Sequence, residues 1–233
     1  MTTHHNSKQP NYAIHDDMYV QAKNAGWAGW GGNERLTNSE QVTRFFAIDA
    51  PMPKGKLLEL GCGEGHLCRA FAQHGYDVTG VDIFPTAIEW AKEKALSSGI
   101  KGRFFVADLT DESVHLPERY QVIIDGNCLH CIIGDDRRTF LKKVHGYLAD
   151  PREGSLADPH EGALQEASVF FVSSLCSKGD SYQLFKDGIV YRHISSAEDL
   201  VAELEQSGFS ILDIQRSERE TNDHITIHAV KSD

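Results

Sequence analysis

Long apolar runs are missing from this sequence of 233 residues. No stretch reaches the roughly 20 apolar residues that a membrane-spanning helix needs. The N-terminal segment MTTHHNSKQP also lacks the apolar core of a secretory signal. We therefore expect neither membrane association nor export, and we predict a cytoplasmic protein.

Basic residues are scarce too, with 23 Lys and Arg against 34 Asp and Glu and a formal net charge of -11. Proteins bind a phosphate backbone through clustered Lys and Arg, which release counterions. An acidic chain repels such a backbone, so we expect no nucleic acid partner. The apolar share of 40% and the charged share of 24% are those of a folded domain rather than of a disordered chain.

Cysteine is too scattered for the disulfide framework of a small secreted protein. The odd set predicts free thiols at Cys62, Cys68, Cys128, Cys131 and Cys176. The pair Cys128-x-x-Cys131, together with Cys176, also allows a thiophilic site for thiol or metalloid chemistry. However, free cysteine is among the most buried residue types and packs as a small apolar side chain. We predict no metal site.

Short apolar runs alternate with helical stretches along the chain, which is typical of parallel strands joined by crossover helices. The last two runs are close enough to pair antiparallel. We predict an α/β fold: a doubly wound, seven-stranded, mostly parallel sheet with an antiparallel C-terminal strand and helices on both faces. The expected strands are 56–60, 77–82, 103–108, 120–125, 167–175, 209–218 and 223–230, and the expected helices are 40–49, 64–74, 85–97, 134–148 and 196–207.

Three segments fall outside this alternation. Residues 1–35 show no clean helical or strand period, and we expect a mobile N-terminal arm or lid before a single domain over residues 36–233. Residues 150–167 contain the near-duplication ADPREGSL and ADPHEGAL and predict a surface loop. Residues 177–194 predict a hairpin insertion, with Asp187 and Gly188 as its turn.

The segment LLELGCGEGH places Gly61, Gly63 and Gly65 where a buried strand turns into a helix. Ligands of open α/β sheets bind at this edge, and glycine lets the backbone approach them closely. A dinucleotide fingerprint, G-x-G-x-x-G, requires a further glycine where this chain has His66. In addition, Glu59 would repel a phosphate. The spacing disfavours NAD, and the acid favours a ligand with a positive centre.

The arrangement Glu59-x-Gly61-x-Gly63-x-Gly65 resembles the cofactor motif of class I, Rossmann-like S-adenosylmethionine-dependent methyltransferases of the small-molecule type. The resemblance extends over residues 38–230. It implies S-adenosylmethionine as cofactor and S-adenosylhomocysteine as product. The implied cofactor contacts are Glu59, Gly61, Cys62, Gly63 and Gly65 in the loop, Asp82 on the ribose hydroxyls, Ile83 against the adenine, Asp108 on the adenine amino group and Leu109 beside the ring.

The fourth expected strand ends in IIDGNCLHCI, which resembles the segment where small-molecule enzymes of this family place a histidine near the methyl group. His130 is our candidate general base, since a free imidazole with a pKa of about 6.5 suits proton abstraction near neutrality. The alternative is a histidine packed at the start of the next helix. Asp125 and Asn127 lie at the same edge, where either side chain would orient the amino acid part of the cofactor or the substrate.

The N-terminal arm contributes three aromatic residues, Tyr19, Trp27 and Trp30, joined by glycines. In related enzymes such arms fold over the cofactor, and aromatic faces attract a cation. The resemblance thus implies a lid over the site. Hydrophobic docking of a terminal segment explains the same residues equally well.

The C-terminal part offers two further sets of candidates. The expected hairpin carries Tyr191, Arg192 and His193 over the same edge, with Arg192 pairing either a substrate carboxylate or, as a surface salt bridge, another side chain. The last strand carries polar residues on one face by its period of two. We interpret them as a polar sheet face rather than as ligands: His224, Thr226 and His228.

We therefore predict an enzyme that transfers a methyl group from S-adenosylmethionine to a nitrogen, oxygen or sulfur of a small molecule by in-line displacement. The alternatives from other classes are an NAD-dependent oxidoreductase and a non-catalytic S-adenosylmethionine-binding protein. Within enzymes, the cysteines leave a thiol or metalloid methyltransferase as a further alternative. The sequence predicts neither the acceptor nor the oligomeric state.

Overall fold

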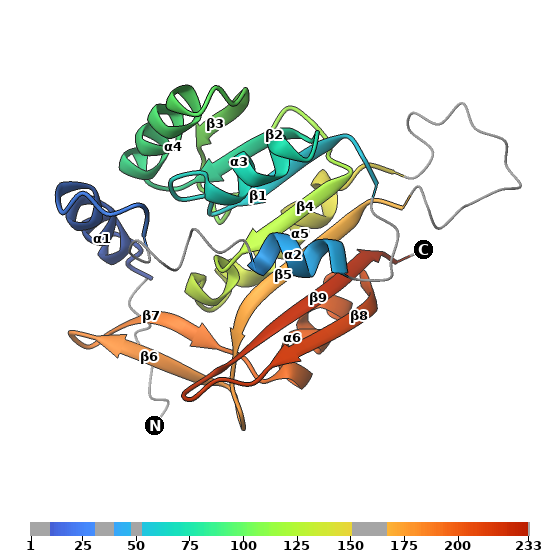
Figure 1. Cartoon of the computed structure of the whole chain (residues 1–233). Coiled ribbons are helices and arrows are strands. Elements are labelled where there is room, and N and C mark those ends of the chain that lie inside the picture. The colour runs from blue at the N-terminus through green and yellow to red at the C-terminus, as the bar shows by residue number, and fades with distance from the viewer. Residues whose placement is uncertain (1–9, 31–39, 48–52, 151–166, 233) are drawn as a thin grey trace, which may run out of the picture.

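The computed structural model describes residues 10–30, 40–47, 53–150 and 167–232. Within these ranges, seven strands form one sheet in the order β3-β2-β1-β4-β5-β9-β8 (Figure 1). The first five pair in parallel, whereas β9 is antiparallel to both β5 and β8, which confirms the predicted fold class. The strands are β1 (Lys56–Leu60), β2 (Asp77–Asp82), β3 (Gly102–Val106), β4 (Val122–Gly126), β5 (Val169–Cys176), β8 (Phe209–Ser217) and β9 (Asp223–Lys231).

Helices pack on both faces of this sheet. Apolar residues that follow each other in a strand are buried on opposite faces: Ile123 and Phe170 lie in one core, while Ile124 and Phe171 lie in the other. Successive strand side chains point to opposite faces, so a sheet covered on both sides requires unbroken apolar runs. The helices are α2 (Glu40–Ala47), α3 (His66–Gln73) and α4 (Pro85–Ser97) on one face, and α5 (Asp136–Tyr147) and α6 (Ala197–Gln206) on the other.

The N-terminal segment is more regular than expected, because Ile14–Asn24 forms helix α1. Its buried face consists of His15, Tyr19 and Ala22, which follow helical spacing. Tyr19 and Ala22 pack against Trp90 of α4. The sequence did not indicate this helix, since two of the three buried residues carry polar atoms and leave little apolar periodicity.

The predicted hairpin is present as β6 (Tyr182–Lys186) and β7 (Ile189–Ile194), a separate two-stranded sheet. Its turn residues Asp187 and Gly188 have φ angles of 53° and 75°, as a type I′ turn requires. Figure 1 shows the hairpin beside the end of β5, below α1. Residues 151–166 of the predicted loop lie outside the described residues. In the parts of the chain that the structure describes, no helix combines the length and apolar character needed to cross a membrane.

Candidate functional site

A cavity of about 850 Å³ lies at the carboxyl ends of the parallel strands. Its lining includes residues from the ends of β1, β2 and β4, from helix α1 and from the hairpin strand β7. The predicted site residues that line it are Tyr19, Trp30, Glu59, Gly61, Cys62, Gly63, Asp82, Ile83, Asp108, Leu109, Asn127, His130 and Arg192. Those that do not are Trp27, Gly65, Asp125, Tyr191 and His193.

The glycine loop turns directly after β1, with Gly61 and Gly63 at φ angles of 59° and 52°. A Cβ atom on Gly61 would lie 2.6 Å from the Cβ of Cys128, so only glycine fits between β1 and the segment after β4. Gly65 also has a positive φ, but its missing Cβ faces the Phe104 ring at 2.9 Å. Gly65 therefore lets α3 pack closely on β3, and its cofactor contact stays a prediction.

Asp82, the last residue of β2, connects the loop to the lid. Its Oδ2 accepts a hydrogen bond from the Gly63 N–H at 2.9 Å and one from the Tyr19 hydroxyl at 3.4 Å. Its Oδ1 accepts one from the Phe84 N–H at 3.0 Å. Burial raises the pKa of Asp82 to about 6, so the carboxylate is ionised at neutral pH. The arrangement presents a fixed anionic acceptor at the cavity.

An apolar part of the cavity adjoins Asp82. Ile83 follows it in the chain, and Ala107 and Leu109 line the same cavity after β3. Between them, Asp108 accepts hydrogen bonds on its Oδ1 from the N–H and the hydroxyl of Thr110, at 2.9 and 2.6 Å. Apolar side chains flanked by carboxylates suit a flat ring that carries hydrogen-bond donors.

Glu59 is buried beneath the cavity and accepts a hydrogen bond from the Cys68 N–H at 2.8 Å. Burial raises its pKa to about 8. The carboxyl is therefore mostly protonated at pH 7, unlike the anion that the sequence suggested. A cation placed beside it would favour the ionised form.

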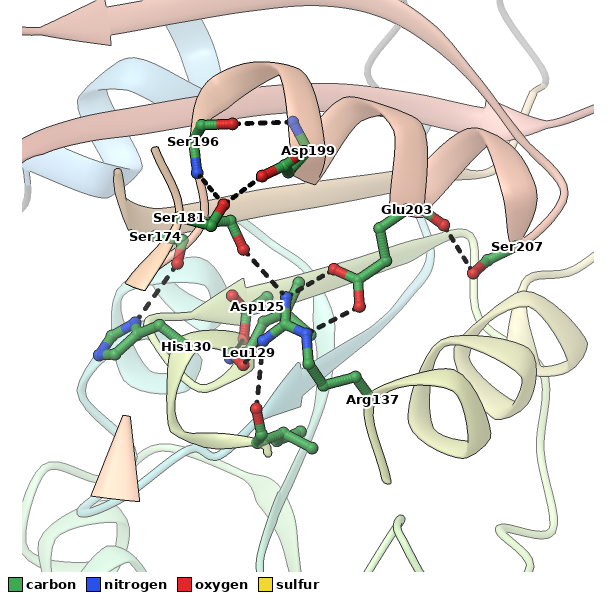
Figure 2. Close-up of polar contacts among 12 residues, drawn as sticks. Asp125, Leu129, His130, Arg137, Ser174, Ser181, Ser196, Asp199, Glu203 and Ser207 are labelled. Carbon is green, nitrogen blue, oxygen red and sulfur yellow. Dashed lines mark hydrogen bonds and ion pairs between the residues drawn. The ribbon is translucent and has the colours of Figure 1, made fainter. Parts of the chain in front are cut away.

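His130 lies in a short 3-10 helix, η1 (Leu129–Cys131), that follows β4. The imidazole is buried but lines the cavity, and its Nδ1 is 3.3 Å from the Ser174 hydroxyl (Figure 2). Burial first, and the nearby charge of Arg192 second, lower its pKa to about 3. The ring is thus neutral at pH 7, a hydrogen-bonding group rather than a strong proton acceptor. Its role as general base stays a prediction.

The side chains of Asp125 and Arg137 hold the turn that carries His130 in place. Asp125 accepts hydrogen bonds from the Cys128 and Leu129 N–H groups, both at 2.9 Å, and is fully buried. This structural role differs from the ligand contact expected of Asp125. Arg137 of α5 donates to the Leu129 carbonyl at 2.7 Å and pairs with Glu203 of α6 through two bonds of 2.7 and 2.6 Å (Figure 2).

A second hydrogen-bonded set involves His224 of β9, which the sequence analysis had not placed in the site. Its Nδ1 is 3.0 Å from Arg44 Nη1, and its Nε2 is 3.1 Å from Asn127 Oδ1. Because arginine only donates, Nδ1 accepts, and Nε2 carries the proton that is donated to Asn127. Asn127 has a left-handed φ of 71° and lines the cavity together with His224.

The polar residues of β9, which we interpreted as a polar sheet face, lie buried in the interior of the sheet. His224, Thr226 and His228 are all buried, because β9 lies inside the sheet between β5 and β8. The His228 ring packs against Phe45 of α2, with ring centroids 5.8 Å apart.

The lid residues divide into two groups. The Tyr19 and Trp30 rings lie against each other over the cavity, with centroids 4.5 Å apart. Trp27 is 47% exposed and lies outside the cavity lining. In the hairpin, Arg192 lines the cavity, whereas the Tyr191 carbonyl lies 3.3 Å from His15 Nε2 and so connects β7 to α1.

The cysteines do not form the three-membered thiophilic site. Cys128 and Cys131 line the cavity, but Cys176 does not. Burial raises the pKa of Cys131 to about 11, so this thiol is neutral. Among the described residues, no group of three His, Cys, Asp or Glu side chains is arranged to hold a metal ion.

Comparison with protein families identifies a "Methyltransferase domain" over residues 57–150. Two curated relatives are ubiquinone biosynthesis O-methyltransferases. The one from Saccharophagus degradans is 36% identical over 101 residues, or 42% of this chain and 43% of that protein. The mitochondrial one from Schizosaccharomyces pombe is 34% identical over 104 residues, or 42% and 38%. The alignments thus span less than half of these relatives.

Solved structures resemble the whole chain. The 1,6-didemethyltoxoflavin-N1-methyltransferase of Burkholderia thailandensis, solved with 1,6-didemethyltoxoflavin and S-adenosylhomocysteine, has a TM-score of 0.70 at 22% identity and covers 95% of this chain and 88% of its own. The magnesium protoporphyrin IX methyltransferase of Synechocystis has a TM-score of 0.64 at 18% identity, covering 95% of each chain. Residues 57–150 therefore match the methyltransferase domain family, within a chain that has the fold of class I, Rossmann-like methyltransferases.

Proposed function

We propose that the protein is an enzyme that transfers a methyl group from S-adenosylmethionine to a nitrogen, oxygen or sulfur atom of a small molecule. The observation that carries this proposal is the hydrogen bond from the Gly63 N–H to the Asp82 carboxylate, both of which line a cavity of about 850 Å³. It supplies a carboxylate acceptor and a bare backbone turn at adjacent strand ends, within the segment that matches the methyltransferase family. Asp82 is the residue we assign to the ribose hydroxyls of the cofactor.

The remaining wall of the cavity fits the other parts of this cofactor. Ile83 and Leu109 supply apolar contacts for the adenine, with Asp108 as an acceptor for its amino group. Glu59 and Tyr19 suit the two positive centres, one through its carboxyl and the other through its ring. Ligand pockets commonly measure about 300–1,000 Å³, so this cavity is large enough for the cofactor together with a small acceptor.

When bound, S-adenosylmethionine supplies a methyl group on an already activated sulfur. The chain's task is to align the acceptor in line with that bond and to exclude water. We assign the exclusion of water to the lid formed by residues 10–30 and the hairpin 182–194. We assign to His130 a hydrogen bond with the acceptor's nucleophilic atom, and the removal of its proton where that atom arrives protonated.

Calorimetric titration of the purified protein tests the cofactor directly. S-adenosylmethionine and S-adenosylhomocysteine are each expected to bind with micromolar dissociation constants, and NAD is expected not to bind. Binding of NAD alone would support an oxidoreductase and overturn the assignment. Binding of the first two with no transfer of label from methyl-labelled S-adenosylmethionine to any acceptor would support a binding protein without catalysis.

Cofactor binding is also expected to release a proton from Glu59. Its pKa of about 8 keeps the free carboxyl mostly protonated at pH 7, and a neighbouring cation lowers that pKa, so the proton leaves. Titrations with S-adenosylmethionine at pH 7 in phosphate and in Tris should therefore give different apparent enthalpies. The difference should shrink in Glu59→Gln and persist in Glu93→Gln, whose side chain is 60% exposed. Equal buffer dependence in all three proteins contradicts the prediction.

Tyr19 provides a test of the lid. Its buried ring lines the cavity and its hydroxyl lies 3.4 Å from Asp82 Oδ2. Tyr19→Ala is expected to weaken S-adenosylhomocysteine binding about tenfold, the equivalent of roughly 1.4 kcal/mol, because it removes a ring contact and opens the cavity to water. Met18→Ala alters the neighbouring residue, which is 38% exposed, and should leave the affinity unchanged. If Tyr19→Ala and Met18→Ala bound S-adenosylhomocysteine with equal affinity, α1 would not be part of the cofactor site.

A further inference from the structure

Arg192 is a charged side chain in the cavity that has no carboxylate partner in the described part of the chain. It projects from β7 of the hairpin and lines the cavity. Its buried Nε atom has no hydrogen-bond partner among the described residues. Two other arginines show the ordinary arrangement, since Arg69 and Arg137 each pair with a glutamate, at 2.7 and 2.6 Å.

The groups that face Arg192 are neutral or cationic. Its charge acts on His15, His130 and Cys131, whose imidazoles and thiol carry no negative charge at neutral pH. The ring of Tyr191 lies 5.5 Å from the guanidinium carbon. Within the described ranges, no Asp or Glu oxygen pairs with the Arg192 guanidinium. A guanidinium that lines a cavity among neutral and cationic neighbours is suited to bind an incoming anion.

Most carboxylates that line the cavity come from the ends of the first three strands or the loop after β1, and one more, Glu218, lies between β8 and β9. Glu59 and Asp82 come from the ends of β1 and β2, and Asp108 follows β3. Arg192 of β7 instead lies near His130, which belongs to the segment after β4. The carboxylates at the ends of β1 and β2 and after β3 suit the positive centres and hydroxyls of the cofactor, whereas Arg192 lies near the residue that we assign to the acceptor.

We propose that Arg192 binds a carboxylate of the methyl acceptor, which makes the substrate a small organic acid. A planar guanidinium matches a carboxylate with two parallel N–H···O bonds, a geometry that lysine does not supply. This inference rests on the proposed function and specifies the substrate class of the same site. The amino acid part of the cofactor also carries a carboxylate, and the experiment must separate the two sources.

The test uses matched acids and amides on the protein saturated with S-adenosylhomocysteine. Benzoate and benzamide, and phenylacetate and phenylacetamide, have nearly the same shape but differ in charge. Ligand-detected NMR should show each acid binding at least tenfold more tightly than its amide. In Arg192→Gln this preference should disappear, while Arg192→Lys should retain part of it. His193→Gln, which changes a neighbour outside the cavity lining, should retain all of it.

The affinity of each variant for S-adenosylhomocysteine is measured as well, to distinguish a site for the acceptor's carboxylate from a site for the cofactor's carboxylate. An unchanged affinity in Arg192→Gln, together with loss of the acid preference, supports an acceptor subsite. A tenfold weaker affinity with no effect on the acids would assign Arg192 to the cofactor's carboxylate and overturn the proposal. Absence of any acid preference in the native protein overturns it as well. Failure of the proposed function is recognised separately, because the native protein would then not bind S-adenosylhomocysteine.

Discussion

Arg137→Met should lower the free energy of unfolding by about 3 kcal/mol. Removing one partner of a buried ion pair typically destabilises a protein by about 3–5 kcal/mol, and we expect the lower end because the Glu203 side chain is 27% exposed. The change also removes the arginine N–H that donates to the Leu129 and Ile132 carbonyls, at 2.7 and 3.2 Å. Both effects act on the contact between α5, α6 and η1 that Figure 2 shows.

Urea unfolding followed by circular dichroism measures this loss, and the adjacent residue supplies its control. Arg138 is on the same helix, but its side chain is 81% exposed and its ion pair with Asp135 is a surface contact. Arg138→Met should change the unfolding free energy by less than about 0.5 kcal/mol. A loss below 1 kcal/mol in Arg137→Met would mean that the turn carrying His130 is held by other contacts.

Asp82→Ala should weaken the binding of S-adenosylhomocysteine at least tenfold. The substitution removes the carboxylate that we assign to the ribose hydroxyls, and charge-assisted hydrogen bonds are each worth roughly 1.5–3 kcal/mol. It also frees the Gly63 N–H, which donates to that carboxylate at 2.9 Å. Calorimetry at pH 7.5 measures the change. Unaltered affinity would exclude Asp82 from the cofactor site.

The pH dependence of binding gives an independent test of Asp82. Burial raises its pKa to about 6, and the ionised form is the one that accepts hydrogen bonds. Affinity should therefore fall as the pH drops through about 6, a step separate from the change near pH 8 that Glu59 contributes. Asp82→Ala should lack this step. Asp77→Ala, at the exposed start of the same strand, should keep both the affinity and the step.

The sequence predicted the parallel sheet and the glycine loop because both depend on local patterns. Strands buried on two faces appear as continuous apolar runs, such as the one around Ile123 and Ile124. The positive φ angles of Gly61 and Gly63 require glycine at positions fixed by the chain itself. Each signal lies within a few residues, so a single sequence is enough to detect it.

The parts that sequence analysis missed depend on contacts between distant residues. His224 reaches the site because β9 inserts between β5 and β8, which brings its ring within 3.1 Å of Asn127. Arg137 meets Glu203 across 66 positions of the chain. No local pattern distinguishes either residue from an ordinary polar side chain. Helix α1 was missed for a related reason, since His15 and Tyr19 on its buried face look polar in the sequence.

The hairpin of β6 and β7 forms its own two-stranded sheet and shares no ladder with the seven-stranded one. Its length and sequence can change without shifting the register of any strand that carries Asp82 or Asn127. Arg192, to which we assign the acceptor's carboxylate, therefore sits on a sheet separate from the main one, while the glycine loop directly follows β1 of the main sheet. Grafting the hairpin of another methyltransferase onto this chain is thus the most direct route to an enzyme with a different acceptor preference.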